Sequence, residues 1–96
     1  MSQTVPDYAK SVKITGRVQS VAFRAWTRSR ATTLGLTGWV RNDPTGSVSA
    51  FVQGDRASVD TLVEEFWSGP GVAAVRDVQS QFSPPDPSLN TFEIQR

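Results

Sequence analysis

The spacing of hydrophobic residues alternates along this chain between a period of two and a period near 3.6, and this succession constrains the fold most. Strand-like alternation over Ser11–Val18 is followed by a helical pattern over Ala22–Leu34, which Gly35 ends. Two further strand patterns, Leu36–Asn42 and Ser47–Gln53, flank a turn rich in Asn, Asp, Pro and Gly. The first half of the chain therefore predicts a strand, a helix and a hairpin.

The second half contains the clearest helical pattern. Its apolar residues fall at i, i+3, i+4, i+7 and i+8, as Val59, Leu62, Val63, Phe66 and Trp67. Either Asp55 or Ser58 is suited to cap its start, and Gly69-Pro70 ends it. A fourth strand is predicted over Val72–Gln79 and a short closing strand over Thr91–Gln95. The prolines of the intervening segment make it a loop.

The order strand, helix, strand, strand, helix, strand predicts an α+β fold of the ferredoxin-like type. In this βαββαβ sandwich an antiparallel sheet carries both helices on one face. The 96 residues suffice for one domain, which we place at residues 11–96. Residues 1–10 show no periodicity and are expected to form a flexible N-terminal tail.

Composition excludes several classes of function. A net charge of +1 gives no field for polyanions, so nucleic-acid binding is not expected. No apolar run is long enough to span a bilayer, and the N-terminal segment lacks a signal core, so we expect a cytoplasmic protein without membrane contact, and a monomer. The chain has no His and no Cys, which removes imidazole and thiolate chemistry and the commonest metal ligands. We expect neither a metal nor a cofactor.

The segment that joins the first predicted strand to the first predicted helix has the character of an anion site. The first N–H groups of a helix lack intrahelical partners, and the helix dipole adds partial positive charge. Arg24 at this corner adds a planar guanidinium, which suits a phosphate dianion. The alternative is an ordinary surface arginine paired with a carboxylate.

Two blocks of the chain resemble a known family. The first reads Gly16-Arg17-Val18-Gln19-Ser20-Val21-Ala22-Phe23-Arg24. It resembles the acylphosphatase signature, glycine-x-valine-glutamine-glycine-valine-x-phenylalanine-arginine. The second block, in the family's order, reads Leu34-Gly35-Leu36-Thr37-Gly38-Trp39-Val40-Arg41-Asn42. Further matches are Gly46-Ser47-Val48, Gly54 and Gly69-Pro70, so that the similarity runs from about Lys13 to Ile94.

The resemblance implies a βαββαβ fold and hydrolysis of small acyl phosphates to a carboxylate and inorganic phosphate, without metal or cofactor. It implies that Arg24 binds the phosphate and that Asn42 holds the attacking water. The phosphate cradle is then formed by the backbone amides of Gln19, Ser20, Val21, Ala22, Phe23 and Arg24. Inorganic phosphate and sulfate are expected to compete with the substrate.

Several assignments have alternatives in the residues themselves. The family has glycine where this chain has Ser20, which is strained if its φ is positive and offers a hydroxyl to phosphate if its φ is negative. Asn42 precedes Asp43-Pro44, so an Asx turn is its alternative role. We expect the Gln19 side chain to brace the loop and Arg41 to be a solvated charge. The residues Phe23, Trp26 and Trp67 are assigned to the core or its edge.

Two other functions remain to be weighed. One is a module of the same fold that holds phosphate or carbamoyl phosphate with slow or no turnover, which Ser20 favours and the single-domain length disfavours. The other is an RNA-recognition domain, which shares the βαββαβ order and stacks bases on strand aromatics. The third predicted strand has only Phe51 and no basic residue leading into it, which disfavours RNA.

Overall fold

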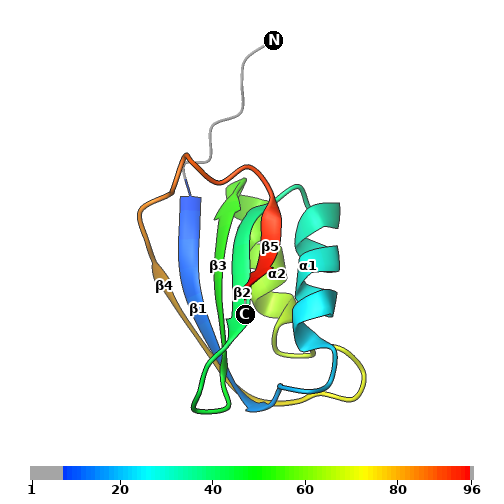
Figure 1. Ribbon diagram of the computed structural model, residues 1–96. Coiled ribbons are helices and arrows are strands. Elements are labelled where there is room, and N and C mark those ends of the chain that lie inside the picture. Colours follow the sequence, from blue (N-terminus) through cyan, green and yellow to red (C-terminus); the bar gives the residue numbers. More distant parts are fainter. Residues whose placement is uncertain (1–7, 96) are drawn as a thin grey trace.

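A five-stranded sheet forms one layer of the protein and two helices form the other (Figure 1). The computed structural model describes residues 8–95. Its elements in chain order are β1 (Tyr8–Arg17), α1 (Phe23–Thr33), β2 (Thr37–Asn42), β3 (Val48–Gly54), α2 (Arg56–Glu65), β4 (Ala74–Phe82) and β5 (Phe92–Gln95). The predicted α+β, ferredoxin-like arrangement is confirmed, and every predicted helix and strand is present.

The strands lie in the order β4-β1-β3-β2-β5, and one pairing corrects the prediction of an antiparallel sheet. The first four strands pair antiparallel, whereas β5 pairs parallel to β2. The chain leaves β4 at one edge, crosses the end of the sheet and returns along the other edge. Because β4 and β2 run in opposite directions, a strand that returns this way must run parallel to β2. The sheet is therefore mixed.

The first strand begins at Tyr8, three residues before the predicted start, so the last part of the predicted tail belongs to the sheet. Tyr8, Ala9 and Lys10 pair with β3, and Ala9 is buried. Tyr8 and Lys10 lie near α2: the Tyr8 hydroxyl donates to Asp60 Oδ1 at 2.9 Å, and Lys10 Nζ lies 3.6 Å from the same oxygen. Because Tyr8 and Lys10 are polar at positions that face α2, this part of the strand lacks the alternation of apolar and polar residues that marks a strand in the sequence. The rest of the predicted tail lies outside the described residues.

The core lies between the sheet and the helices. Its side chains include Ile14, Val40 and Val52 from the strands and Phe23, Leu62 and Phe66 from the helical layer. Phe23 is buried as predicted, and Trp26 packs beside it at the edge of this cluster. The core assignment of Trp67 is wrong, because 47% of this residue is exposed. Helix α2 ends at Glu65, so the 3.6-residue spacing no longer directs Trp67 inward.

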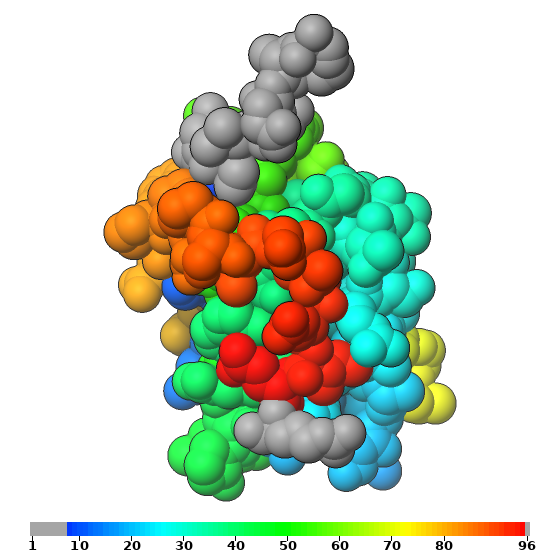
Figure 2. Space-filling model, turned by 45° about the horizontal axis from the view of Figure 1, so that its top comes forward, coloured from blue at the N-terminus to red at the C-terminus, as the bar shows by residue number. Residues whose placement is uncertain are grey.

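Two side-chain interactions connect the two helices to each other and the loop after β4 to the sheet. Arg30 of α1 makes a bidentate pair with Glu65 of α2, with N–O distances of 2.8 and 3.0 Å. The loop after β4, orange in Figure 2, is tied to β3 because the buried Gln53 side chain donates to the Asp86 carbonyl and accepts from its N–H. Among residues 8–95, no helix is long and apolar enough to cross a membrane.

Candidate active site

The loop between β1 and α1 and the turn between β2 and β3 lie at the same end of the protein (Figure 1). A bulge between Thr15 and Gly16 shifts the register of β1 against β4 just before this loop. Gly16 has φ +122, and a Cβ there would lie 2.3 Å from the Ala74 carbonyl oxygen. Glycine is therefore required where the chain turns from the sheet into the loop.

Two residues of the loop adopt left-handed backbone conformations that L-residues rarely take. Ser20 has φ 61 and Ala22 has φ 62. The positive φ of Ser20 decides between the two alternatives for this residue: Ser20 occupies a position suited to glycine and is strained there. Ala22 is in the same situation, which nothing in its sequence position indicated. Turns of this kind gather successive N–H groups into a concave surface that favours anions.

The start of α1 leaves its amides available. Ala22 is the N-cap and offers no side-chain acceptor, and the first turn contains no acidic residue. Within the described part of the chain, no oxygen accepts a hydrogen bond from the backbone N–H groups of residues 19–25. The helix dipole and these N–H groups therefore present partial positive charge toward the loop.

A pocket of about 250 Å³ lies at this helix terminus. Its walls are Val18, Ser20, Ala22, Phe23, Arg24, Ala25, Asn42 and Ile94. Five of the predicted site residues thus line one pocket, four from the loop and helix start and one from the end of β2. Gln19 and Val21, the other two predicted cradle residues, are not among its walls.

The Arg24 side chain is held by a backbone group. Its Nη1 donates to the Gln95 carbonyl at 3.2 Å, which fixes the guanidinium beside β5. No carboxylate of residues 8–95 forms an ion pair with Arg24, so the alternative of an ordinary surface pair finds no support there. The side chain keeps its other donors for a ligand.

The Asn42 side chain is placed at the same pocket and has an unused acceptor. Its Oδ1 is buried and accepts no hydrogen bond from any described residue. A buried acceptor without a partner costs about 1–3 kcal/mol, so such atoms attract a donor from solvent or ligand. The Asx turn that was its alternative role is not formed, because Oδ1 accepts no hydrogen bond; the turn is held instead by the Asp43 carboxylate, which accepts from the Ser47 and Ser49 hydroxyls at 2.8 and 2.6 Å.

Gln19 joins the loop to the turn that follows Asn42. Its Nε2 donates to the carbonyls of Asp43 and Ser47, both at 2.8 Å. The expected bracing role of this side chain is confirmed. What the sequence did not indicate is the target, a turn 24 residues away from Gln19.

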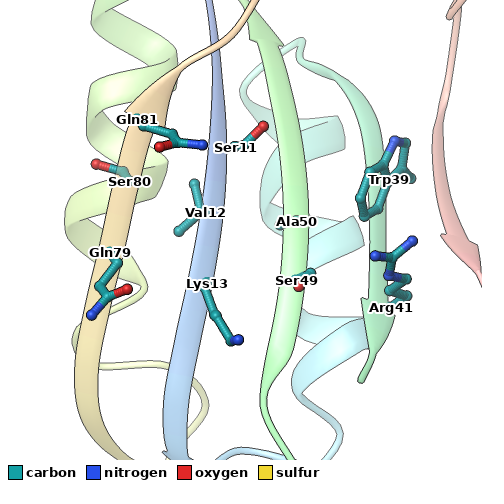
Figure 3. A pocket seen from close by; sticks show the side chains of 10 residues that line it. All are labelled: Ser11, Val12, Lys13, Trp39, Arg41, Ser49, Ala50, Gln79, Ser80 and Gln81. Carbon is teal, nitrogen blue, oxygen red and sulfur yellow. The ribbon is translucent and has the colours of Figure 1, made fainter. Parts of the chain in front are cut away.

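Arg41 lies on the other face of the sheet, because successive side chains of β2 alternate between its two faces. Figure 3 shows Arg41 and Trp39 beside a separate hollow of about 380 Å³ on the face without helices. The Arg41 guanidinium lies over the Trp39 ring at 5.0 Å, and its Nε is 3.4 Å from Asp43 Oδ1. Its side chain is 49% exposed, so Arg41 is a surface charge and not a member of the loop site.

The charge of Asp43 is protected by its partners. Burial alone raises the pKa of this carboxyl, but the Ser49 and Ser47 hydroxyls and the Arg41 guanidinium outweigh that effect and lower the pKa below its ordinary value. Asp43 is therefore ionised at neutral pH. Within residues 8–95, no group of three or more potential ligand side chains is arranged to hold a metal ion.

Comparison with known proteins shows similarity over most of the chain, including the loop between β1 and α1. The sequence profile of the acylphosphatase family matches residues 10–94. An acylphosphatase of Sinorhizobium medicae is 47% identical over 88 residues, which cover 92% of this chain and 94% of that protein. An acylphosphatase of Rhizobium meliloti is 52% identical over 73 residues, 76% of this chain and 77% of the relative.

A solved structure extends the similarity to three dimensions. The acylphosphatase from Coxiella burnetii superposes with a TM-score of 0.87 at 36% identity, covering 99% of this chain and all of that one. The similarity thus includes both the sheet with its two helices and the loop that carries the signature. The chain belongs to the acylphosphatase family.

Proposed function

We propose that this protein hydrolyses the carboxyl–phosphate bond of small acyl phosphates, giving a carboxylate and inorganic phosphate without a metal or a cofactor. The observation that carries the proposal is the pocket that Arg24, Asn42 and the start of α1 with its free amides line together. The pocket thus combines donors for an anion with an amide side chain suited to orient a water molecule.

The phosphoryl group is bound by Arg24 and by the N–H groups of residues 19–24. A guanidinium donates to two oxygens at once, and the amides neutralise the charge that remains. These donors are fixed before substrate arrives, since Arg24 is held by Gln95 and the loop by Gln19. Preorganised donors need little rearrangement as charge develops in the transition state.

Asn42 orients the attacking water by accepting one of its hydrogens. The water oxygen forms the new bond to phosphorus while the bond from phosphorus to the acyl oxygen breaks, and the acyl group leaves as a carboxylate. An amide is too weak a base to take the water's proton, so a phosphoryl oxygen of the substrate receives it. This chemistry suits a chain without histidine, because the leaving group is already good.

A second candidate keeps the phosphate site but lacks efficient turnover. The left-handed Ser20 favours it, because strain in the loop can shift the amides from their catalytic positions. A module of this kind binds phosphate or carbamoyl phosphate and releases it unchanged. The two candidates differ in turnover, not in binding. With the enzymatic role we also expect a monomer that acts in the cytoplasm.

The deciding experiment is hydrolysis of benzoyl phosphate in the presence of EDTA, with inorganic phosphate as inhibitor. We expect turnover that EDTA does not change, and Asn42→Ala should lower kcat by roughly 10²-fold or more while leaving phosphate inhibition nearly intact. Phosphate binding without turnover would instead establish the binding module. Complete loss of activity with EDTA would contradict the mechanism, and a collapse of phosphate affinity in Asn42→Ala at unchanged kcat would remove the role of Asn42.

A further inference from the structure

The β2–β3 turn contains a charged network that the mechanism above does not use. We propose that Asp43 is a positioning residue: its carboxylate closes this turn and thereby fixes Asn42 relative to Arg24. The inference rests on the proposed function, and it concerns the residue next to the water-binding amide rather than the amide itself.

The Asp43 carboxylate is the centre of the network. Its Oδ2 accepts from both Ser47 Oγ and Ser49 Oγ, at 2.8 and 2.6 Å, and its Oδ1 lies 3.4 Å from Arg41 Nε. Only 13% of the Asp43 side chain is exposed, and Ser47 is buried. Without the carboxylate, Ser47 keeps Thr45 Oγ1 at 3.3 Å and little access to solvent, and the half-buried Ser49 loses its 2.6 Å bond.

The backbone of the same residue is held from two directions. Its N–H donates to the Ser47 carbonyl at 2.8 Å, and its own carbonyl accepts from Gly46 N at 3.1 Å. The Gln19 amide then binds the carbonyls of Asp43 and Ser47 together. The turn is thus tied by its side-chain network to β3 and by Gln19 to the loop before α1.

Asn42 directly precedes Asp43, so the conformation of the turn determines where the Asn42 side chain lies. The donors for phosphate stand on other elements, the β1–α1 loop and α1, and Arg24 is fixed by Gln95 of β5. Asp43 contacts none of these donors through its side chain. Loosening the turn therefore displaces the water-binding group directly, whereas it reaches the phosphate donors only through the Gln19 bonds to the Asp43 and Ser47 carbonyls. A shift of about 1 Å in such a group can cost up to about 10²-fold in rate.

The test separates turnover from binding in three variants. Asp43→Ala removes the acceptor for both serines, and we expect a kcat at least about tenfold lower with a much smaller loss of phosphate inhibition. Asp43→Asn places one amide oxygen where Oδ2 stood, which accepts both hydroxyls, so it should restore most of the kcat. Asp77→Ala removes a carboxylate of β4 whose side-chain partner is Gln79, and serves as the matched control without effect.

Other results overturn the proposal. They are an unchanged kcat in Asp43→Ala, an equal loss in Asp43→Asn, and a parallel collapse of phosphate inhibition. If Asp43→Ala fails to fold, Ser49→Ala removes the 2.6 Å bond alone and should lower kcat in the same direction, by less. An unchanged kcat there also refutes the idea.

A readout independent of turnover separates this proposal from the proposed function. The NMR signals of the Asn42 side-chain amide in phosphate-bound protein should shift or broaden in Asp43→Ala and stay in place in Asp43→Asn. If the unaltered protein hydrolyses no acyl phosphate, the proposed function fails while this measurement still decides the role of Asp43. Identical Asn42 signals in all variants would refute that role.

Discussion

Replacing Ser20 by glycine is expected to stabilise the protein, although Ser20 lines the pocket of the candidate active site. Its φ of 61 lies in the left-handed region. That conformation costs an L-residue about 1–2 kcal/mol, whereas glycine adopts it freely but loses about 0.5–1 kcal/mol more backbone entropy on folding. The difference is a gain on the order of 0.5–1 kcal/mol in the free energy of unfolding, or roughly 2–8 °C in Tm.

The assay is urea unfolding of Ser20→Gly beside a control in which the same substitution meets a helical backbone. Ser29 is an exposed residue inside α1, so Ser29→Gly should destabilise the protein by roughly 0.5 kcal/mol through lost helix propensity. Opposite signs for the two variants would confirm that the conformation of Ser20 decides the result. Destabilisation by both variants to the same extent would refute the reasoning.

The same variant tests whether Ser20 contributes to binding through its side chain. A cradle made of backbone amides predicts that phosphate inhibits Ser20→Gly as strongly as it inhibits the unaltered protein. A clear loss of phosphate affinity would show that the hydroxyl contacts the anion in spite of the positive φ. A rise in kcat at unchanged phosphate inhibition would show that strain in the loop limits turnover.

Three further predictions follow from the site and the helical layer. Arg24→Lys should lose nearly as much kcat/KM as Arg24→Ala, because a point charge does not replace a planar fork; near-normal turnover of the lysine variant would exclude bidentate binding. Millimolar phosphate or sulfate should raise Tm relative to chloride at matched ionic strength, since a ligand of the native state stabilises it, and an unchanged Tm would count against the anion site. The Arg30 hydrogen bond lowers the pKa of Glu65 below its ordinary value of 4.5, so the stability from this pair is present above that pH and is lost as pH falls through the folded pKa. Acid titration of the unfolding free energy should therefore show a smaller drop below about pH 4.5 in Glu65→Gln than in the unaltered protein, and equal drops would exclude this contribution.

Much of the fold could be predicted from local patterns. The alternation in the strands and the spacing of Val59, Leu62 and Phe66 identify elements because burial on one face imposes a period on the sequence. The Asp55 cap was one of two candidates, and the structure selects it: Asp55 accepts from the Ser58 N–H at the start of α2. The start of β1 was missed because Tyr8 and Lys10 are polar at positions that face α2.

The candidate site also has one part that local sequence patterns predict and one part that they do not. The succession of residues 16–24 indicated a strand-to-helix corner with an arginine, and this is a local property that the sequence carries. Which distant residue completes the site is a question of how strands are placed side by side. The pairing of β2 with β3 and β5, together with the Gln19 bonds to Asp43 and Ser47, brings Asn42 to the pocket of Arg24; the family resemblance implied this residue, but no local pattern did.

The sequence by itself therefore determined the order of the elements, the absence of imidazole and thiol chemistry, and the strand-to-helix corner that carries Arg24. The tertiary structure decided the direction of β5, the left-handed conformations of Ser20 and Ala22, and the hydrogen-bond partners of Asp43. The physical reason is that periodicity and capping act between near neighbours in the chain. Strand direction, backbone strain and the partner of a buried oxygen depend instead on which distant segments meet.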